Sequence, residues 1–517
     1  MSQTEPVPAQ TASTTVRRIA LAAMLIAAGN IASRVLGLVR ESVIGAHFGL
    51  GVDTFTAASI VPTQLYDLLI NGAISAALVP VLSEYAEGDE REFWHVASTV
   101  INLALLVLAA LAAVLALLAG PVVTVVGGGF AGPARAEAMA MVRWLMPAVV
   151  LMGLSGLITA LLYARQKFLL PAFTTSAYNL GIIAAAALLA TRFGPFALVF
   201  GVLLGAGLQV LLQLPGLRGM AYRPTIDLRH PGVRRILKLY APVALGITFS
   251  TIGVTIDRNL ASQFGGAISA MRYATTLIQF PLGLVAAAIS FAVLPILSRQ
   301  ASAGDKQAFG ATLGMGLKVV LLLVLPATFA LAALRGPIVA AIFQRHQFGS
   351  QDAAMTAQAL LLYLPGLPAA ALDQVLLFAV YAHKRTLMPN LVQGGAVLIY
   401  LATALGLLAT TQLGFGALVL GNSAQWVGHL LILLYCSREL IVLRGLRLGE
   451  AFVKCGAASV ALGLAAWGAS SLVSAPLAQL ALGGAAGAAV YLALCAALRV
   501  EALDFFLGAL MRKLRRR

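Results

Sequence analysis

The sequence predicts an all-α polytopic membrane protein with about fourteen transmembrane helices, arranged as two six-helix lobes that are parallel repeats plus two C-terminal helices. Of the 517 residues, 60% are hydrophobic and 10% are charged, a composition that excludes an ordinary water-soluble domain. Apolar runs of roughly 20 residues, the length of a transmembrane helix, recur along the whole chain. An internal repeat, described below, sets the number of helices in each lobe.

Fourteen helical segments follow from these runs and the turn signals between them. In chain order they are 17–47, 52–84, 92–119, 134–163, 171–192, 195–220, 231–263, 266–299, 306–334, 353–382, 388–411, 415–443, 449–473 and 476–498. The first run is long and continues into charged sequence, so it is predicted to be a membrane helix and not a cleaved signal peptide. Residues 1–16 are expected to form a disordered tail, and residues 499–517 a basic cytoplasmic tail.

Basic residues are distributed unevenly between the two sides that these segments define. The chain has 35 Lys and Arg against 19 Asp and Glu, a net charge of +16, and most of the basic residues lie at the termini and in the loops of one side. The basic residues assigned to the other side are Arg135, Arg192, Arg335 and Arg345. This asymmetry identifies the basic side as cytoplasmic. Both termini are therefore predicted to be cytoplasmic, and the charge does not indicate a nucleic-acid partner.

An internal repeat relates the two halves of the chain. The stretch "AISAALVPVLSEYAEGD" (73–89) is similar to "AISFAVLPILSRQASAGD" (288–305), and "GPVV" at 120 returns as "GPIV" at 336. Each repeat holds six helices, and an even number gives both repeats the same orientation, so we expect them to be related by an axis along the membrane normal. The substrate site is expected between them. The resulting domains are 17–220, 231–443 and, outside the repeat, 449–498.

Charged residues inside the predicted spans are costly in a membrane and usually face a protein interior or a wet cavity. The basic ones are Arg34, Arg40, Arg143, Arg258, Arg272 and Lys318, and the acidic ones are Glu41, Asp67, Asp257 and Asp373. On an unbroken helix Arg34 and Glu41 share a face, with Arg40 beside it. These side chains either line a pathway or are salt-bridged struts between helices. Arg143 and Lys318 are interpreted as side chains that extend outward from helix ends.

The second predicted helix carries a polar stripe. Its members, spaced i, i+3, i+7 and i+11, are Gln64, Asp67, Asn71 and Ser75. At this spacing they line one face of an otherwise apolar helix, which Pro62 and Gly72 are expected to bend. The matching residues of the second lobe are Gln279, Leu282, Ala286 and Ser290. The stripe therefore predicts a cavity wall or a buried polar contact in the first lobe. The second lobe has apolar residues at two of the four matching positions.

No motif for enzymatic chemistry is found. No span contains two neighbouring acids that would hold a metal-bound diphosphate, and the chain has no G-x-x-x-x-G-K-[ST] motif. Cys436, Cys455 and Cys495 match no metal or redox spacing, and the six histidines form no i, i+4 pair. We therefore predict a protein that is not an enzyme and that has no organic cofactor.

Several stretches resemble the MurJ/MviN family of lipid II flippases, within the multidrug/oligosaccharidyl-lipid/polysaccharide exporter superfamily. They are "SRVLGLVRE", "GVDTFTAASIVP" and "NGAISAALVPVLSEY" in the first 90 residues, and "RYATTLIQFPLGLVAAAISFAVLPILS" and "YAHKRTLMP" later. The resemblance implies transport of an undecaprenyl-linked peptidoglycan precursor across the bacterial inner membrane by alternating access. It also implies a cationic cavity between the lobes for the diphosphate, and a groove formed by residues 449–498 for the polyprenyl tail.

The resemblance also carries residue roles. Arg34 and Arg40 stand at two family arginines, Glu41 at their acidic neighbour, and Asp53 at the aspartate of a "TDAF" motif. Asp257 matches an aspartate associated with sodium binding. Asp257 and Asp373 are thus candidate ligands for Na⁺ as a coupling ion, because Na⁺ needs hard oxygen ligands, although Asp373 is equally interpreted as a hydrogen-bonded core acid.

The chain departs from the family at several positions. Tyr66 and Asn71 stand where the family often has an arginine and a glutamate, Thr276 stands in place of an arginine, and Arg385 replaces an acid. Arg272, one turn before Thr276 on the same face, is expected to replace the missing arginine. The departures concern the handling of the substrate and not the helix arrangement.

Together these observations predict a lipid II flippase that works as a monomer. Two guanidinium groups in an apolar helix suit a diphosphate, whose oxygens accept several directional hydrogen bonds. The predicted substrate-binding residues are Arg34, Arg40, Glu41, Asp53, Gln64, Asp67, Asn71 and Arg272. The alternatives are a flippase for another polyprenyl-linked oligosaccharide, which would also use arginines, and a cation-coupled multidrug antiporter, which would have a cavity dominated by acids.

Overall fold

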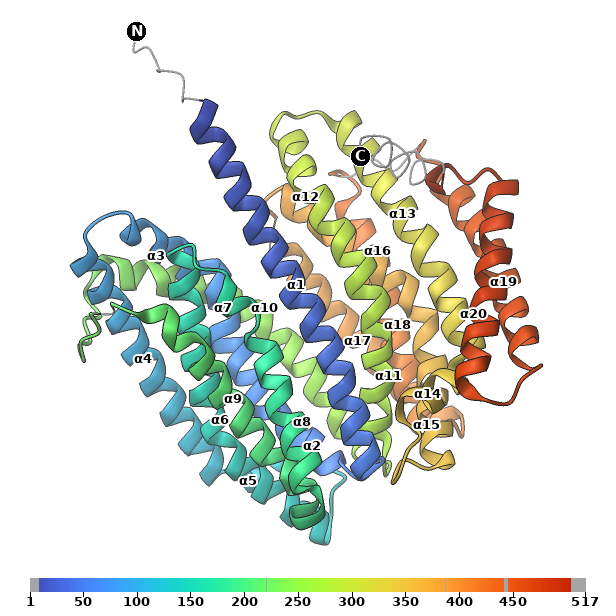
Figure 1. Ribbon diagram of the computed structural model, residues 1–517, viewed down its shortest axis with the longest axis horizontal. Helices are drawn as coiled ribbons and strands as arrows, with labels where there is room; N and C mark the ends of the chain where they lie inside the picture. Colours follow the sequence, from blue (N-terminus) through green and yellow to red (C-terminus); the bar gives the residue numbers. More distant parts are fainter. Residues whose placement is uncertain (1–8, 220, 386, 441–444, 504–517) are drawn as a thin grey trace. The chain divides into compact units, whose positions relative to one another are not determined.

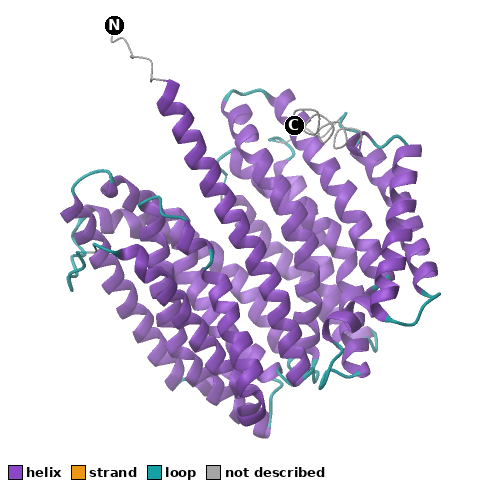
Figure 2. Cartoon of the chain, in the orientation of Figure 1, coloured by secondary structure: helices purple, strands orange, loops and turns teal. Residues whose placement is uncertain are grey.

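The computed structural model describes residues 9–219, 221–385, 387–440 and 445–503, and the regular elements in these ranges are all helices (Figures 1 and 2). The predicted all-α class is confirmed. Within the described residues, nine helical segments are long and apolar enough to cross a membrane. The fourteen predicted spans all fall on helices, but their number as transmembrane helices stays a prediction. The predicted spans outside the nine segments are 17–47, 52–84, 231–263 and 266–299, and they carry all eight predicted substrate-binding residues.

The chain forms two compact units. Unit 1 comprises Met1–His47 and Thr54–Thr251, and unit 2 comprises Phe48–Asp53 and Ile252–Arg517. The helices of unit 1 are α1 (Ala9–Phe48), α2 (Asp53–Tyr66), α3 (Val79–Ala86), α4 (Glu90–Leu117), α5 (Ala119–Val126), α6 (Gly132–Ala164), α7 (Leu169–Ala172), α8 (Thr174–Phe193) and α9 (Ala197–Gln213). Helix α10 (Pro231–Ala261) passes from unit 1 into unit 2.

Unit 2 has a similar series of helices and then two more. Its helices are α11 (Ala267–Pro281), α12 (Ala287–Ser302), α13 (Lys306–Ala333), α14 (Arg335–Phe343), α15 (Ser350–Tyr363), α16 (Leu367–Ala382), α17 (Leu387–Thr410), α18 (Phe415–Ser437), α19 (Leu448–Ser470) and α20 (Pro476–Ala497). The last two pack on each other and on α13, and together these three helices form a hydrophobic core.

Backbone irregularities recur in the two units at the spacing of the sequence repeat. A π-helical turn, η1 (Asp67–Asn71), follows α2, and another, η5 (Leu282–Ala286), follows α11 215 residues later. Left-handed backbone recurs at Gln166 (φ 57°) and Lys384 (φ 59°). This agreement supports the duplication. The relation of the two units by an axis along the membrane normal stays a prediction.

Glycines allow the helices of unit 1 to pack closely. A Cβ atom on Gly156 of α6 would lie 2.3 Å from Cγ2 of Ile70 in η1, so the π turn rests against a helix surface without a side chain. A Cβ on Gly205 of α9 would lie 2.6 Å from the carbonyl oxygen of Tyr178 in α8. The backbones of α8 and α9 therefore pack at a distance that only glycine permits.

Both predicted tails differ from expectation where the structure describes them. Helix α1 begins at Ala9, so residues 9–16, which were expected to be disordered, are helical. At the other end, Val500 and Leu503 are buried in the core of α13, α19 and α20, so the first residues of the predicted 499–517 tail belong to the fold. The sequence pattern missed this because the apolar residues are interleaved with charges.

Candidate functional site

Arg40 and Glu41 form an ion pair on α1. Nη2 and Nε of Arg40 donate to the same carboxylate oxygen, Oε1 of Glu41, at 2.7 and 3.1 Å. Nη1 of Arg40 donates to Oδ1 of Asn179 on α8 at 2.9 Å, and Asn179 in turn donates to the carbonyl oxygen of Ser33 at 3.1 Å. The guanidinium is therefore held in a fixed orientation from both sides.

Burial differs between the members of this cluster. The Glu41 side chain is 1% exposed, whereas that of Arg40 is 27% exposed. A buried carboxylate needs a cation and hydrogen bonds to offset its lost hydration, and Arg40 supplies both. Arg34, six residues earlier on α1, is partly buried. The arrangement fits both expected roles of Arg40. Its guanidinium is held by Glu41 and Asn179, as in a structural salt bridge, and part of the side chain is exposed to solvent, as substrate binding requires.

The polar stripe of the second predicted helix lies on α2 and η1. Asn71 is exposed and its Nδ2 donates to Oδ1 of Asp67 at 3.0 Å across the π turn. Gln64, partly buried, accepts at 3.0 Å from Oγ1 of Thr251 on α10. Unit 1 therefore brings Asp67 and Asn71 together, while Gln64 turns towards α10. The side chain of Ser75 lies outside the described residues.

Asp53 is engaged within unit 2. Its Oδ1 accepts from the backbone N–H of Ser269 at 2.8 Å and from the Ser269 hydroxyl at 2.6 Å. Ser269 is the third residue of α11, so the carboxylate satisfies a backbone donor that the first turn of the helix leaves open. The predicted substrate role of Asp53 stays a prediction beside this capping role.

Asp257 sits at a junction of three helices in unit 2. Its Oδ1 accepts from the Tyr400 hydroxyl on α17 and from Nδ2 of Asn422 on α18, both at 2.8 Å. The neighbouring Arg258 has two buried nitrogens, Nε and Nη1, for which the described part of the chain offers no hydrogen-bond partner. The hydrogen bonds that the structure records for Asp257 therefore go to Tyr400 and Asn422, and not to Arg258.

Asp373 and the remaining basic residues also have defined surroundings. Oδ1 of Asp373 on α16 lies 2.8 Å from Nδ1 of His429 on α18, and both side chains are largely buried. A hydrogen-bonded core acid is thus the arrangement seen. Arg272 lies beside the Tyr273 ring, 5.7 Å from its centroid. Lys318 was interpreted as extending from a helix end, which is wrong: it is buried on α13 and paired with Glu501 at 2.5 Å.

The sequence pattern missed the partners of these charges. They are Asn179, Tyr400, Asn422 and His429. Asn422 and His429 are seven residues apart in an apolar helix, a spacing that places them on one face and that was a usable signal. A single polar residue such as Asn179 gives no such pattern. Across the described ranges, no group of three His, Cys, Asp or Glu residues is placed to hold a metal ion.

Comparison with known proteins decides the family. A family model described as lipid II flippase MurJ matches residues 42–482. The chain belongs to the MurJ family. A lipid II flippase MurJ of Burkholderia cenocepacia is 33% identical over 397 residues, which cover 73% of this chain and 76% of the relative. A probable lipid II flippase MurJ of Vibrio cholerae is 32% identical over 393 residues, covering 72% and 74%.

Solved structures show the same fold. A lipid II flippase MurJ in an inward closed conformation aligns with a TM-score of 0.80 at 24% identity, over 94% of this chain and 100% of that one. An inward-facing multidrug resistance MATE family transporter of the MOP superfamily aligns with a TM-score of 0.67 at 13% identity, over 81% and 95%. The MurJ resemblance read from the sequence is therefore confirmed, and the chain is a multi-pass membrane protein.

Proposed function

We propose that this chain is a lipid II flippase of the bacterial inner membrane. It moves undecaprenyl-diphosphate-linked muropeptide from the inner to the outer leaflet by alternating access between its two units. The observation that carries the proposal is the match of residues 42–482 to the MurJ family, joined to the guanidinium of Arg40 that Glu41 and Asn179 hold in a defined orientation. A transporter of this kind performs no covalent chemistry, in keeping with the absence of an enzymatic motif from the sequence.

Arg34 and Arg40 are proposed to bind the diphosphate. Guanidinium groups bind phosphate oxygens through paired, directional hydrogen bonds, which strengthen in a cavity with little water. Glu41 and Asn179 orient Arg40 before the substrate arrives, so less freedom is lost on binding. Glu41 also reduces the positive field, which favours release of the anion on the far side of the membrane.

The other predicted residues have supporting roles. Asp67 and Asn71, with Gln64 above them, would form the polar wall that contacts the sugar or peptide part of the substrate. From unit 2, Arg272 would add a third guanidinium, and Asp53 would act at the end of α11 that it caps. These roles rest on the residue types and on the resemblance to the MurJ family.

Helices α19 and α20 are proposed to hold the polyprenyl tail. Two large apolar side chains in the second half of α19, Leu464 and Trp467, are more than half exposed. Such a surface suits contact with hydrocarbon.

The basic termini and loops support a cytoplasmic location for both ends of the chain. We further propose that the protein acts as a monomer and without nucleic acid.

Na⁺ is proposed as a coupling ion at Asp257. The carboxylate, the Tyr400 hydroxyl and the Asn422 side chain converge from three helices, and an ion of this type needs several converging oxygens. Asn422 can present its amide oxygen in the other rotamer of the side-chain amide. Asp373 is the weaker candidate Na⁺ ligand because its Oδ1 is already hydrogen-bonded to His429.

The experiment is replacement of an essential flippase. The chain is produced in a bacterium whose own lipid II flippase is depleted, and growth and the lipid II content of the outer leaflet are measured. Restored growth with outward movement of lipid II is expected. A chain that reaches the membrane but restores neither is not a lipid II flippase, and movement of a different polyprenyl-linked oligosaccharide would favour the first alternative.

A further inference from the structure

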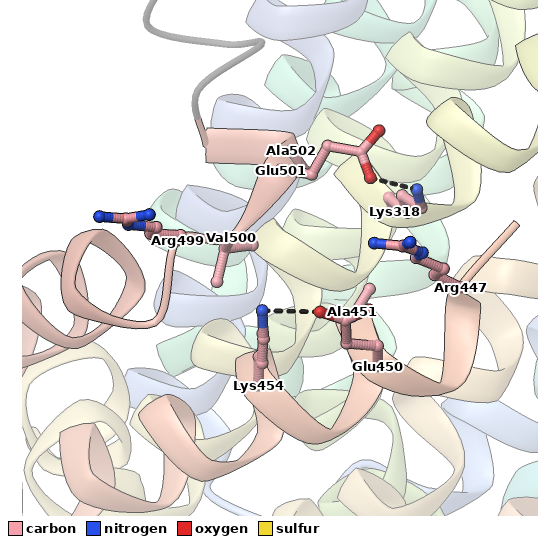
Figure 3. Close-up of a pocket in the computed structure, with 9 residues that line it drawn as sticks. All are labelled: Lys318, Arg447, Glu450, Ala451, Lys454, Arg499, Val500, Glu501 and Ala502. Carbon is pink, nitrogen blue, oxygen red and sulfur yellow. Dashed lines mark hydrogen bonds and ion pairs between the residues drawn. The ribbon is translucent and has the colours of Figure 1, made fainter.

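A basic pocket of about 300 Å³ lies in unit 2 beside the middle of α13, the start of α19 and the segment after α20, apart from the predicted substrate residues. Its lining, drawn in Figure 3, consists of Lys318, Arg447, Glu450, Ala451, Lys454, Arg499, Val500, Glu501 and Ala502. These residues come from the middle of α13, the first turns of α19 and the segment after α20. Three elements far apart in the sequence thus place charged groups around one small cavity.

The charges in the pocket are not balanced. Lys318 pairs with Glu501 at 2.5 Å, and Lys454 pairs with Glu450 at 2.7 Å. The guanidinium of Arg447 is drawn near Lys318 in Figure 3, and within residues 9–219, 221–385, 387–440 and 445–503 the structure records no ion pair for it. Arg499 points away from this group in the same view. The side chains that face one another therefore carry an excess of one positive charge.

Arg447 is held in an unusual backbone conformation. It precedes α19 with φ 50° and ψ 34°, in the left-handed region, which is unfavourable for a residue with a Cβ. Arg447 lines the pocket at the start of α19, the end of a helix that carries a partial positive charge.

Lys318 is the second unusual cation. Its side chain is 9% exposed, whereas that of its partner Glu501 is 60% exposed. The carboxylate can therefore move into solvent, but the ammonium group that it leaves stays in the pocket and requires another anion. Glu501 is thus a ligand of Lys318 that a bound anion can replace.

Exposed apolar surface lies on the other faces of α19, beside the face that lines the pocket. Phe452 and Val453, which immediately precede Lys454 on α19, are 51% and 67% exposed. An anion with hydrocarbon chains can thus place its charge on the basic residues and its chains on α19, which a free inorganic anion cannot do. Basic pockets between membrane helices bind lipid headgroups in this manner.

We propose that this pocket binds the phosphate of an anionic phospholipid from the adjoining leaflet. Arg447 and Lys454 contact the phosphate oxygens, and Lys318 joins them when Glu501 withdraws. The bound lipid is distinct from the transported substrate, so the inference stands independently of the transport role.

The test measures lipid binding to the purified full-length protein. Short-chain phosphatidylglycerol, short-chain phosphatidylcholine and inorganic phosphate are titrated separately, and thermal unfolding confirms that each variant is folded. Arg447→Gln is expected to weaken phosphatidylglycerol binding by about 10-fold or more, the effect of losing a charge-assisted hydrogen bond. Glu501→Gln is expected to tighten it, because Lys318 no longer has a competing carboxylate. Arg438→Gln, which removes a charge beside Tyr435 outside the pocket, is the matched control and should leave binding unchanged.

Three results would overturn the proposal. Equal binding of phosphatidylglycerol and phosphatidylcholine shows that the headgroup charge is not recognised. Equal loss in Arg447→Gln and Arg438→Gln shows a general surface charge effect. Inorganic phosphate that binds as tightly as phosphatidylglycerol shows a free-anion site and removes the lipid from the proposal.

Discussion

Two π-helical turns, one in each unit, share a backbone and differ in their side chains. In unit 1, η1 contains Asp67 and Asn71, joined by a hydrogen bond of 3.0 Å. In unit 2, η5 has Leu282 and Ala286 at the matching positions. A π turn in a long helix is rare and is often found at functional sites. Its presence in both units shows that the wide turn does not require the polar pair.

Unit 1 also has a second irregularity. A further π turn, η2 (Ile74–Leu78), follows closely on η1, whereas the matching stretch of unit 2 is part of the α-helix α12. The additional widening therefore coincides with the polar stripe. The comparison indicates that the shared turn does not depend on polar side chains, and that the polar pair is specific to unit 1.

The largest effect is expected at the arginines of unit 1. Arg34→Ala and Arg40→Ala should each weaken lipid II binding by roughly 10- to 150-fold, since each removes a charge-assisted bond to the diphosphate. Lysine should restore binding only in part, because the planar fork is lost. Binding of lipid II to purified protein is the measurement. Arg143→Ala, an exposed arginine on α6, is the control. Unchanged binding in folded Arg34→Ala and Arg40→Ala proteins would make both residues structural.

The paired helices of the two units should differ in their tolerance of a methyl group. A Cβ on Gly205 meets the backbone oxygen of Tyr178 at 2.6 Å, whereas a Cβ on Gly428 of α18 meets the end of the Ile399 side chain at 2.4 Å. The backbone at Tyr178 cannot move away from an added methyl group without shifting α8, whereas the end of the Ile399 side chain can rotate. Gly205→Ala should therefore lower the free energy of unfolding by about 1–3 kcal/mol, the usual cost of overpacking, and Gly428→Ala by less.

Denaturation of the purified variants measures this difference. Gly207→Ala, on the same helix as Gly205 but with no atom within 4 Å of its Cβ position, is the control. If Gly205→Ala and Gly207→Ala unfold alike, close backbone packing is not what stabilises the α8–α9 pair.

Exchanging the π-turn side chains tests the comparison directly. Asp67→Leu with Asn71→Ala gives η1 the residues that η5 already has, so the variant should fold normally. Transport should fall by roughly 2- to 10-fold, the effect of losing one or two polar contacts to substrate. The thermal midpoint and the rate of lipid II movement are measured together. A large loss of stability would show that the polar pair supports the fold of unit 1 and not its function.

The smallest effect is expected where the first turns of α4 meet the segment before α10. In unit 1, His95 lies 3.3 Å from Asp227 in the segment before α10, and its hydrogen bond lowers the pKa of the Asp227 carboxyl. A lowered folded-state pKa stabilises the protein above the unfolded pKa, and this contribution is lost as the pH falls through the folded value. His95→Phe should therefore reduce stability slightly at pH 7. The reduction should disappear in acid, and a pH-independent difference would exclude the pair as its cause.

The positions of the helices and of the charged residues within them could be predicted from the sequence, because apolar runs and isolated charges are local patterns. Sequence reasoning also placed Asp67 and Asn71 on one face, and the structure brings them together. It did not find the brace of Arg40, since Asn179 lies 139 residues away and no periodicity links them. Lys318 was misread for the same reason: its partner Glu501 follows the last helix, in a stretch that looked like a free tail.

The shared π turn has a consequence for the history of the chain. A feature that stands at the same place in both halves, 215 residues apart, is the arrangement expected when one ancestral unit with an irregular second helix is duplicated. The second turn, η2, and the polar pair are confined to one copy, so the two copies have diverged at this point. The other copy is followed by two further helices, α19 and α20.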